Sequence, residues 1–274
     1  MREYWERIKA DDFAVPDDRP LPELFEDLCD GLASPDPDLR DGAVFPVLAT
    51  WVSRGVFDTD PRTVGDRMAV MLRAEEIQAR TFATLVLAAL IERDNEVHNV
   101  DGTDAHRWFV AFAEWWVGES DLRGWDDSRG WLHAVAHGAD TLAAYGASRH
   151  LGVVGLRDLL DTVRRRLVAG TDHVWDAQED DRVALACAVV LARPELSAED
   201  AVDWLSTLTQ TLRERAEPGP VPAVTQNSLH TVKALYLLVN RGFRFDDREM
   251  SVPHREAVED SLVEVLTVGW SAVA

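Results

Sequence analysis

Apolar residues recur at intervals of three and four positions along most of the chain, which is the spacing of one buried face of an α-helix. Alternating apolar and polar runs are scarce, and no Asn-Gly or Asp-Gly turn lies between such runs. Clusters of Pro, Gly and Asp interrupt the helical pattern, and Ser197 and Pro61 suit helix starts at two of these breaks. The pattern therefore predicts an all-α protein of about a dozen helices.

The helices are predicted to pair, because a polar segment with an Arg or Asn precedes an apolar stretch five times. The five segments align at Arg40, Arg80, Arg129, Arg182 and Asn227, with spacings of 40, 49, 53 and 45 residues. HEAT and armadillo units repeat every 40–47 residues or so, and each helix hairpin buries its apolar face against its neighbours. We expect a single domain over residues 1–274 that forms an irregular α-solenoid of HEAT/armadillo-like hairpins. A compact all-α orthogonal bundle is the alternative.

The net charge of the chain makes some classes of binding partner unexpected. Lys plus Arg number 28 and Asp plus Glu number 49 in 274 residues, so the formal net charge is −21. Binding to nucleic acid depends on clustered cations, which makes a nucleic-acid partner unexpected. The excess of acidic residues is also what adaptation to high salt would produce, and it predicts that added salt stabilises the fold.

Three further features bear on location. Cys29 and Cys187 lie in apolar helical patterns without Cys or His at metal-ligand spacing, as expected of buried free thiols in a reducing cytoplasm. The first residues are charged and lack the apolar stretch of a signal peptide. The longest nearly apolar run, residues 82–91, falls far short of the roughly 20 residues of a membrane span. We therefore expect a cytoplasmic protein without a membrane partner.

The ten tryptophans raise the question of an aromatic ligand site. Around Trp108, however, the aromatic residues recur at i, i+3, i+4 and i+7, which places them on one helix face; the others are Phe109, Phe112, Trp115 and Trp116. Such a face is expected to pack in the core rather than to form an aromatic cradle.

One segment departs from plain packing, because it carries several titratable side chains at helical spacing. If residues 129–140 form one helix, Arg129, His133, His137 and Asp140 share an arc of about 80°. The small residues Ala134 and Gly138 lie near this arc and would let a ligand or another backbone approach closely. The segment predicts a polar, titratable stripe opposite a buried apolar face.

The stripe allows three interpretations. Two imidazoles one turn apart and a carboxylate could hold a divalent metal, with His133, His137 and Asp140 as ligands. The same groups could instead form a metal-free polar pocket, or they could simply hydrogen-bond to neighbouring helices. No Glu follows the first His, as the zinc-protease motif requires, and no fourth ligand is evident.

Equivalent helices of a solenoid would line one concave surface, so neighbouring units could add to the stripe. The candidates are Arg80, Thr84, Glu179, Asp180, Arg182, Asn227, His230 and Lys233. Lys233 is one of two lysines in the chain, which makes it a candidate for anion binding or for chemistry, although a lone Lys is usually a solvated charge.

Three strings carry a resemblance to a known family: ARTFATLVLAALIERDN, EWWVGESDLRGWDDSRGWLHAVAHGADTLAAYG and WDAQEDDRVALACAVVL. They resemble the bacterial family catalogued as domain of unknown function 2785, most closely over about residues 35–195. The resemblance implies a HEAT-like helical protein with a common structure around Trp131, His133, His137, Asp140 and residues 179–182. It implies no assigned reaction.

Two functional hypotheses follow. The first is a protein-interaction or small-ligand-binding module whose polar concave site centres on Arg129, His133, His137 and Asp140. The second is a metal-dependent enzyme, of hydrolase or oxygenase type, in which His133, His137 and Asp140 hold the metal and Glu179 or Asp180 acts as acid or base. A DNA-binding helical-repeat protein is a third option, and it conflicts with the net charge.

Overall fold

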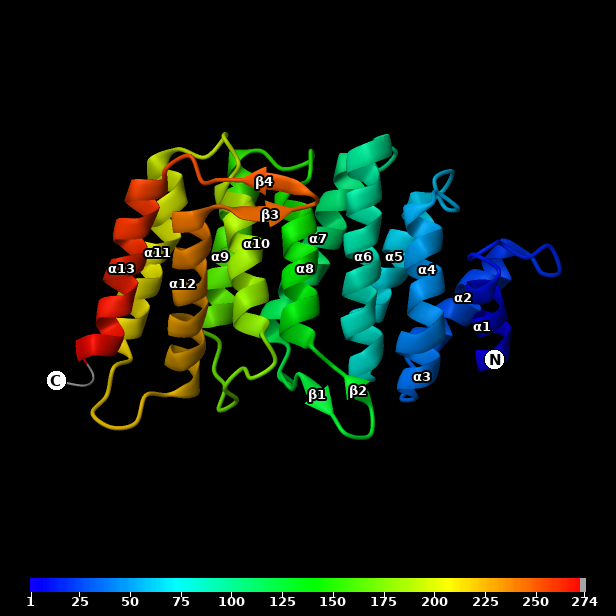
Figure 1. Ribbon diagram of the computed structural model, residues 1–274, viewed down its shortest axis with the longest axis horizontal. Helices are drawn as coiled ribbons and strands as arrows, with labels where there is room; N and C mark the ends of the chain where they lie inside the picture. Colours follow the sequence, from blue (N-terminus) through cyan, green and yellow to red (C-terminus); the bar gives the residue numbers. More distant parts are fainter. Residues whose placement is uncertain (272–274) are drawn as a thin grey trace.

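The computed structural model describes residues 1–271, and it is built almost entirely of helices in two rows (Figure 1). The predicted all-α class is therefore confirmed. The finer assignment to HEAT/armadillo-like hairpins stays a prediction, as does the orthogonal bundle.

Successive helices alternate between the two rows, and neighbouring helices of the same row pack against each other along the molecule. The front row consists of α4 (Phe45–Ser53), α6 (Ile77–Val97), α8 (Ala134–Gly146), α10 (Glu179–Leu191) and α12 (Ala223–Arg241). The back row consists of α5 (Pro61–Met71), α7 (Gly102–Gly118), α9 (Val153–Leu167), α11 (Ala198–Glu214) and α13 (Arg255–Ser271). The rows run from the N-terminal side of the molecule to its C-terminal side (Figure 1).

The N-terminal end of the rows is covered by α1 (Arg2–Ala10) and α2 (Leu21–Leu32). A short helix, α3 (Pro37–Leu39), and a π-helical segment, η1 (Arg40–Val44), then lead into α4. The five polar segments aligned in the sequence all lie at or before the start of the front-row helices. Because these helices are parallel, their polar beginnings lie at the same edge of the molecule, which is the lower edge in Figure 1.

Two β-hairpins interrupt the helices, and the apolar pattern did not predict them. Strands β1 (Trp125–Asp126) and β2 (Gly130–Trp131) pair before α8, and β3 (Phe243–Phe245) and β4 (Arg248–Met250) pair after α12. The first hairpin lies at the edge where the front-row helices begin. The second lies across the opposite ends of α10 and α8 (Figure 1).

The core forms between the rows and contains most of the large aromatic side chains. Trp108, Phe112 and Trp116 are buried, which confirms the core-packing interpretation of the aromatic face. Gly138 of α8 is required by this packing, because a Cβ there would overlap the indole of Trp116. Gly138 thus makes room for a core side chain rather than for a ligand.

Three local predictions can also be compared with the structure. Ser197 caps α11 in a capping box with Asp200, and Pro61 opens α5 behind the cap residue Asp60. Cys29 and Cys187 are buried free thiols. No helix within residues 1–271 is both long and apolar enough to cross a membrane.

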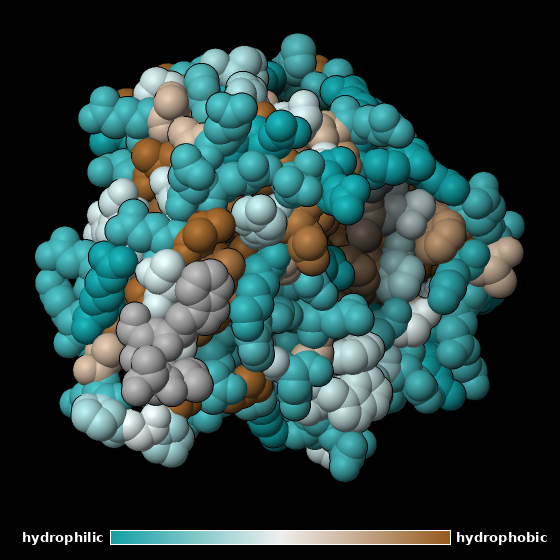
Figure 2. All heavy atoms as spheres, turned by 60° about the vertical axis from the view of Figure 1, so that its left-hand side comes forward, coloured by the Kyte–Doolittle hydropathy of each residue, from teal (hydrophilic) through white to brown (hydrophobic). Residues whose placement is uncertain are grey.

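The surface agrees with the high charge of the chain. Figure 2 shows a predominantly hydrophilic face on which hydrophobic side chains are confined to small areas between polar ones.

Candidate functional site

The predicted stripe folds differently from the continuous helix that the sequence suggested. Helix α8 begins only at Ala134, and His133 is its N-cap residue, with φ 48° and ψ 36°. Arg129 lies in the exposed turn of the β1–β2 hairpin, outside the helix. The prediction that Arg129 and His133 belong to the helix is therefore wrong, because a hairpin and a left-handed residue precede its first turn.

His133 lies between the hairpin and the start of α10. Its Nε2 is 3.0 Å from the carbonyl oxygen of Ala177, and its ring stacks on Trp131 with centroids 4.4 Å apart. Because a carbonyl only accepts hydrogen bonds, this contact assigns the proton to Nε2. The Nδ1 atom of His133 is left as an acceptor, and none of the residues within 1–271 donates to it.

Glu179 is a fully buried carboxylate behind His133. It is the first residue of α10, and its Oε2 accepts a hydrogen bond of 2.8 Å from the amide of Ala177. Its Oε1 is 3.7 Å from Nε2 of His133 and has no hydrogen-bond partner. Gly124 permits this arrangement, since a Cβ there would be only 2.8 Å from Oε1.

His137 follows one turn later, and its ring meets the ring of His133 edge-on, with centroids 5.6 Å apart. The ring also contacts Phe82 of α6 edge-on at 5.2 Å. Its Nδ1 is buried without a partner. Burial lowers the pKa of His137 to about 3, and the charges of His133 and Arg182 add to the effect. His137 is therefore a neutral imidazole at pH 7.

Asp140, one further turn along α8, is held by Arg182 of α10. The guanidinium donates to both carboxylate oxygens, with Nε 2.8 Å from Oδ1 and a second contact between Nη2 and Oδ2. Burial raises the pKa of the Asp140 carboxyl, and the ion pair with Arg182 opposes that rise. Asp140 is thus hydrogen-bonded to Arg182 and not to His133 or His137.

The three predicted metal ligands do not fit a metal. Nε2 of His133 is engaged by a carbonyl, and Asp140 is engaged by Arg182. Within residues 1–271 no three His, Cys, Asp or Glu side chains converge as a metal centre requires. The predicted ligand set of His133, His137 and Asp140 is therefore not a metal site in this fold.

Arg40 holds the hairpin that carries Trp131. It is fully buried, its Nη2 donates to the carbonyl oxygen of Arg129 at 2.6 Å, and its Nε donates to Asp41 at 2.6 Å. Its guanidinium also lies 4.9 Å from the ring centroid of Phe82. In the sequence, Arg40 aligns with the other segment starts, and nothing in that alignment places it at the site.

The hairpin presents two tryptophans at the molecular surface. Trp125 and Trp131 pair across the strands, contact each other edge-on at 5.0 Å, and are 53% and 42% exposed. The sequence WDDSRGW carried the only signal for this hairpin, because it places a Gly-containing polar turn between two aromatic residues. An exposed aromatic pair thus lies against the half-buried imidazoles.

The remaining candidates lie at or beyond the border of this cluster. Asp180 is 4.0 Å from the Nδ1 of His230, and Lys233 is exposed on α12. Asn227 is buried and holds the loop before α10, because its side chain bonds to the backbone of His173 and Trp175. Farther along the front row, Arg80 pairs with Glu119 at 2.7 Å, and the Thr84 carbonyl accepts from Thr141. Hydrogen bonds and ion pairs within the fold therefore engage Asn227, Arg80 and Thr84, which lie outside the imidazole cluster.

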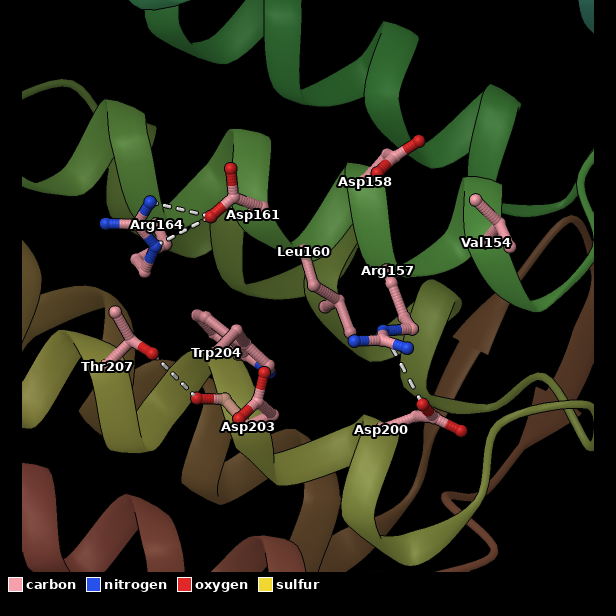
Figure 3. Close-up of a pocket in the computed structure, with 10 residues that line it drawn as sticks. All are labelled: Val154, Arg157, Asp158, Leu160, Asp161, Arg164, Asp200, Asp203, Trp204 and Thr207. Carbon is pink, nitrogen blue, oxygen red and sulfur yellow. Dashed lines mark hydrogen bonds and ion pairs between the residues drawn. The ribbon is translucent and has the colours of Figure 1, made fainter.

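A separate cleft lies on the back row between α9 and α11 and has a volume of about 400 Å³ (Figure 3). Its two arginines are already paired with carboxylates of the same cleft, Arg157 with Asp200 at 3.6 Å and Arg164 with Asp161 at 2.6 Å. The NH group of Trp204 donates to the Ala201 carbonyl. Because these groups have partners, the cleft carries less evidence for a ligand than the imidazole cluster does.

Comparison with known proteins identifies a family to which the chain belongs. The model of a family described as "Protein of unknown function (DUF2785)" matches residues 72–237, which include the hairpin, both imidazoles and Glu179. None of the curated proteins matches the chain. None of the solved structures matches it either.

Proposed function

The chain belongs to the DUF2785 family, and from this premise we propose that it is a binding protein for cations that carry N–H donors, such as guanidinium or ammonium groups. The proposed site consists of Trp131, His133, His137 and the buried Glu179. The ligand is either a small molecule or an Arg or Lys side chain of a protein partner.

The observation that carries this proposal is a cluster of polar atoms without hydrogen-bond partners, in which Oε1 of Glu179 and Nδ1 of His133 are acceptors. Nδ1 of His137 and Oε1 of Glu179 are both buried without a hydrogen-bond partner. Nδ1 of His133 is also an acceptor, because the proton of this ring is on Nε2. Each buried polar atom without a partner costs about 1–3 kcal/mol, so a ligand that donates hydrogen bonds to this site would recover part of that free energy.

Two further features support a cation in particular. Indole rings attract cations placed over their faces, with about 0.5–2 kcal/mol of stabilisation, and Trp131 is 42% exposed, with the face that His133 does not cover open to a cation. The net charge of −21 also raises the local concentration of cations around the molecule. An anion would have to approach the buried carboxylate of Glu179, which disfavours it.

The test is an NMR titration of the protein with n-butylguanidinium. A cation of this size is expected to bind with a dissociation constant of about 1 mM, given the free energy that small ligands gain per atom. Tetramethylammonium, which has the charge but no N–H donor, should bind at least about tenfold more weakly. Butyrate should not bind.

Variants locate the interaction. Trp131→Ala and His137→Phe should each weaken butylguanidinium binding several-fold, whereas His106→Phe, an exposed position on α7, should leave it unchanged. A short peptide with one Arg tests the side-chain source, because tighter binding of the peptide than of butylguanidinium would favour a protein partner. Equal binding of tetramethylammonium and butylguanidinium would contradict the proposal.

A further inference from the structure

A groove lies on the front row, nearer than the imidazole cluster to the end of the helices where the β3–β4 hairpin lies. It has a volume of about 620 Å³ and is lined by α4, α6, α8, α10 and the β3–β4 hairpin. The hairpin lies across this end of the row and contributes Phe245 to the lining (Figure 1). Its volume is within the range of roughly 300–1,000 Å³ typical of small-molecule sites.

The walls of this groove are mostly apolar. Phe45, Leu85, Leu185 and Phe245 contribute apolar surface from four different elements, and small alanines such as Ala89 leave the space between them open. An alkyl chain or an aromatic ring would bury its apolar surface there, with about 25 cal/mol gained for each Å² removed from water.

The polar groups at the groove carry an excess of negative charge. Asp140 is paired with Arg182, so these two charges offset each other. Glu92 lies at the rim, and within residues 1–271 neither Glu92 nor Asp246 of the hairpin turn forms an ion pair with Arg, Lys or His. Desolvation against the groove, together with the nearby carboxylates Asp246 and Asp140, raises the pKa of Glu92. Arg182, which is paired with Asp140, is thus the one cationic side chain among the residues that line the groove.

We propose that this groove binds an amphiphilic amine, with the apolar body against Phe45, Leu185 and Phe245 and the ammonium group beside Glu92. The occupant is a small molecule, because the groove has the volume of a small-molecule site and the β3–β4 hairpin contributes Phe245 to its lining. The groove is a site of its own, and its occupation does not depend on ligand binding at the imidazole cluster.

Isothermal titration with octylamine, below the concentration at which it aggregates, tests this inference. Octylamine should bind at least about tenfold more tightly than octanoate, which has the same chain and the opposite charge. Glu92→Gln should weaken octylamine binding about threefold, as expected for the loss of one partly exposed ion pair. This variant changes one exposed side chain, so it leaves the fold intact.

A variant that fills the groove provides a second test of octylamine binding. Ala89→Trp should abolish octylamine binding, whereas Ala111→Trp, a matched substitution on back-row helix α7, should leave the affinity within about twofold. Equal affinity for octanoate and octylamine would overturn the inference, and so would unchanged octylamine binding in Ala89→Trp.

The two sites can be separated experimentally. Trp131→Ala and His137→Phe should leave octylamine binding within about twofold of that of the unmodified protein. Ala89→Trp should likewise leave butylguanidinium binding unchanged. Loss of octylamine binding in Trp131→Ala would show that the ligand occupies the imidazole cluster, which would overturn the groove inference and leave the proposed function standing.

Discussion

The half-buried imidazole of His137, whose Nδ1 atom is fully buried, should make the stability of the fold depend on pH in a way that one substitution removes. The folded protein keeps this ring neutral until the pH approaches about 3, because burial lowers its pKa. In the unfolded chain a histidine takes up a proton near pH 6.5. Below pH 6.5 the unfolded state therefore binds more protons than the folded state does, and the free energy of unfolding falls as the pH falls.

The size of this effect follows from the two pKa values. Between pH 7.5 and pH 5.0 the difference in proton binding corresponds to about 2 kcal/mol if the pKa of the folded state is about 3. Relaxation around the charged ring would reduce the loss to about 1 kcal/mol. The stability that His137 contributes in its neutral form is thus fully present above pH 6.5 and is lost progressively as the pH falls toward 3.

The assay is urea unfolding of the unmodified protein and of His137→Phe at both pH values. Other groups, chiefly carboxylates, also titrate in this range, but their contribution is common to both proteins and cancels in the difference. We expect the unmodified protein to lose about 1–2 kcal/mol more than His137→Phe between pH 7.5 and pH 5.0. His106→Phe, at an exposed position, serves as the control and should behave like the unmodified protein. Equal losses in His137→Phe and the unmodified protein, within about 0.5 kcal/mol, would refute the reasoning.

Three further predictions concern the packing of buried groups. Arg40→Met should lower the free energy of unfolding by about 3 kcal/mol, because Asp41 loses its cation and the hairpin loses its anchor; unchanged amide exchange at residues 129–131 would contradict this. Gly138→Ala should cost about 1–3 kcal/mol through overlap with Trp116, whereas Gly118→Ala, with open space around its Cβ, should cost nothing measurable by urea unfolding. Burial raises the pKa of Cys29 to about 12 and raises that of Cys187 as well, so a thiol reagent at pH 8 should label neither in the native protein and both in urea; rapid native labelling would contradict the burial.

The helices could be predicted because their apolar faces depend on local spacing. The five aligned polar segments precede or begin the five front-row helices, whereas the interpretation of these segments as HEAT/armadillo-like repeats stays a prediction. The β1–β2 hairpin could not be predicted from periodicity, because each strand has only two residues. Its turn depends on Asp126, whose carboxylate accepts from Ser128 and Arg129, and on Gly130 at φ 71°.

The composition of the site was only partly predictable from the sequence, because some of its contacts join residues that are distant in the chain. The spacing of His133 and His137 correctly placed them close together, although His133 is a cap rather than a helical residue. The burial of Glu179 could not be predicted, because the run EDDR is typical of an exposed helix start. That burial depends on the loop before α10 and on Gly124, which are distant in sequence and meet only in the folded chain.

The proposed site requires an imidazole nitrogen that accepts a hydrogen bond from the ligand, and the imidazole ¹⁵N spectrum reports its protonation. Long-range ¹H–¹⁵N spectra at pH 7.5 should show Nδ1 of His133 without a proton, and the resonances of His133 and His137 should both shift when butylguanidinium is added. A protonated Nδ1 of His133 in the free protein, or resonances that do not move at a saturating concentration of butylguanidinium, would contradict the proposal.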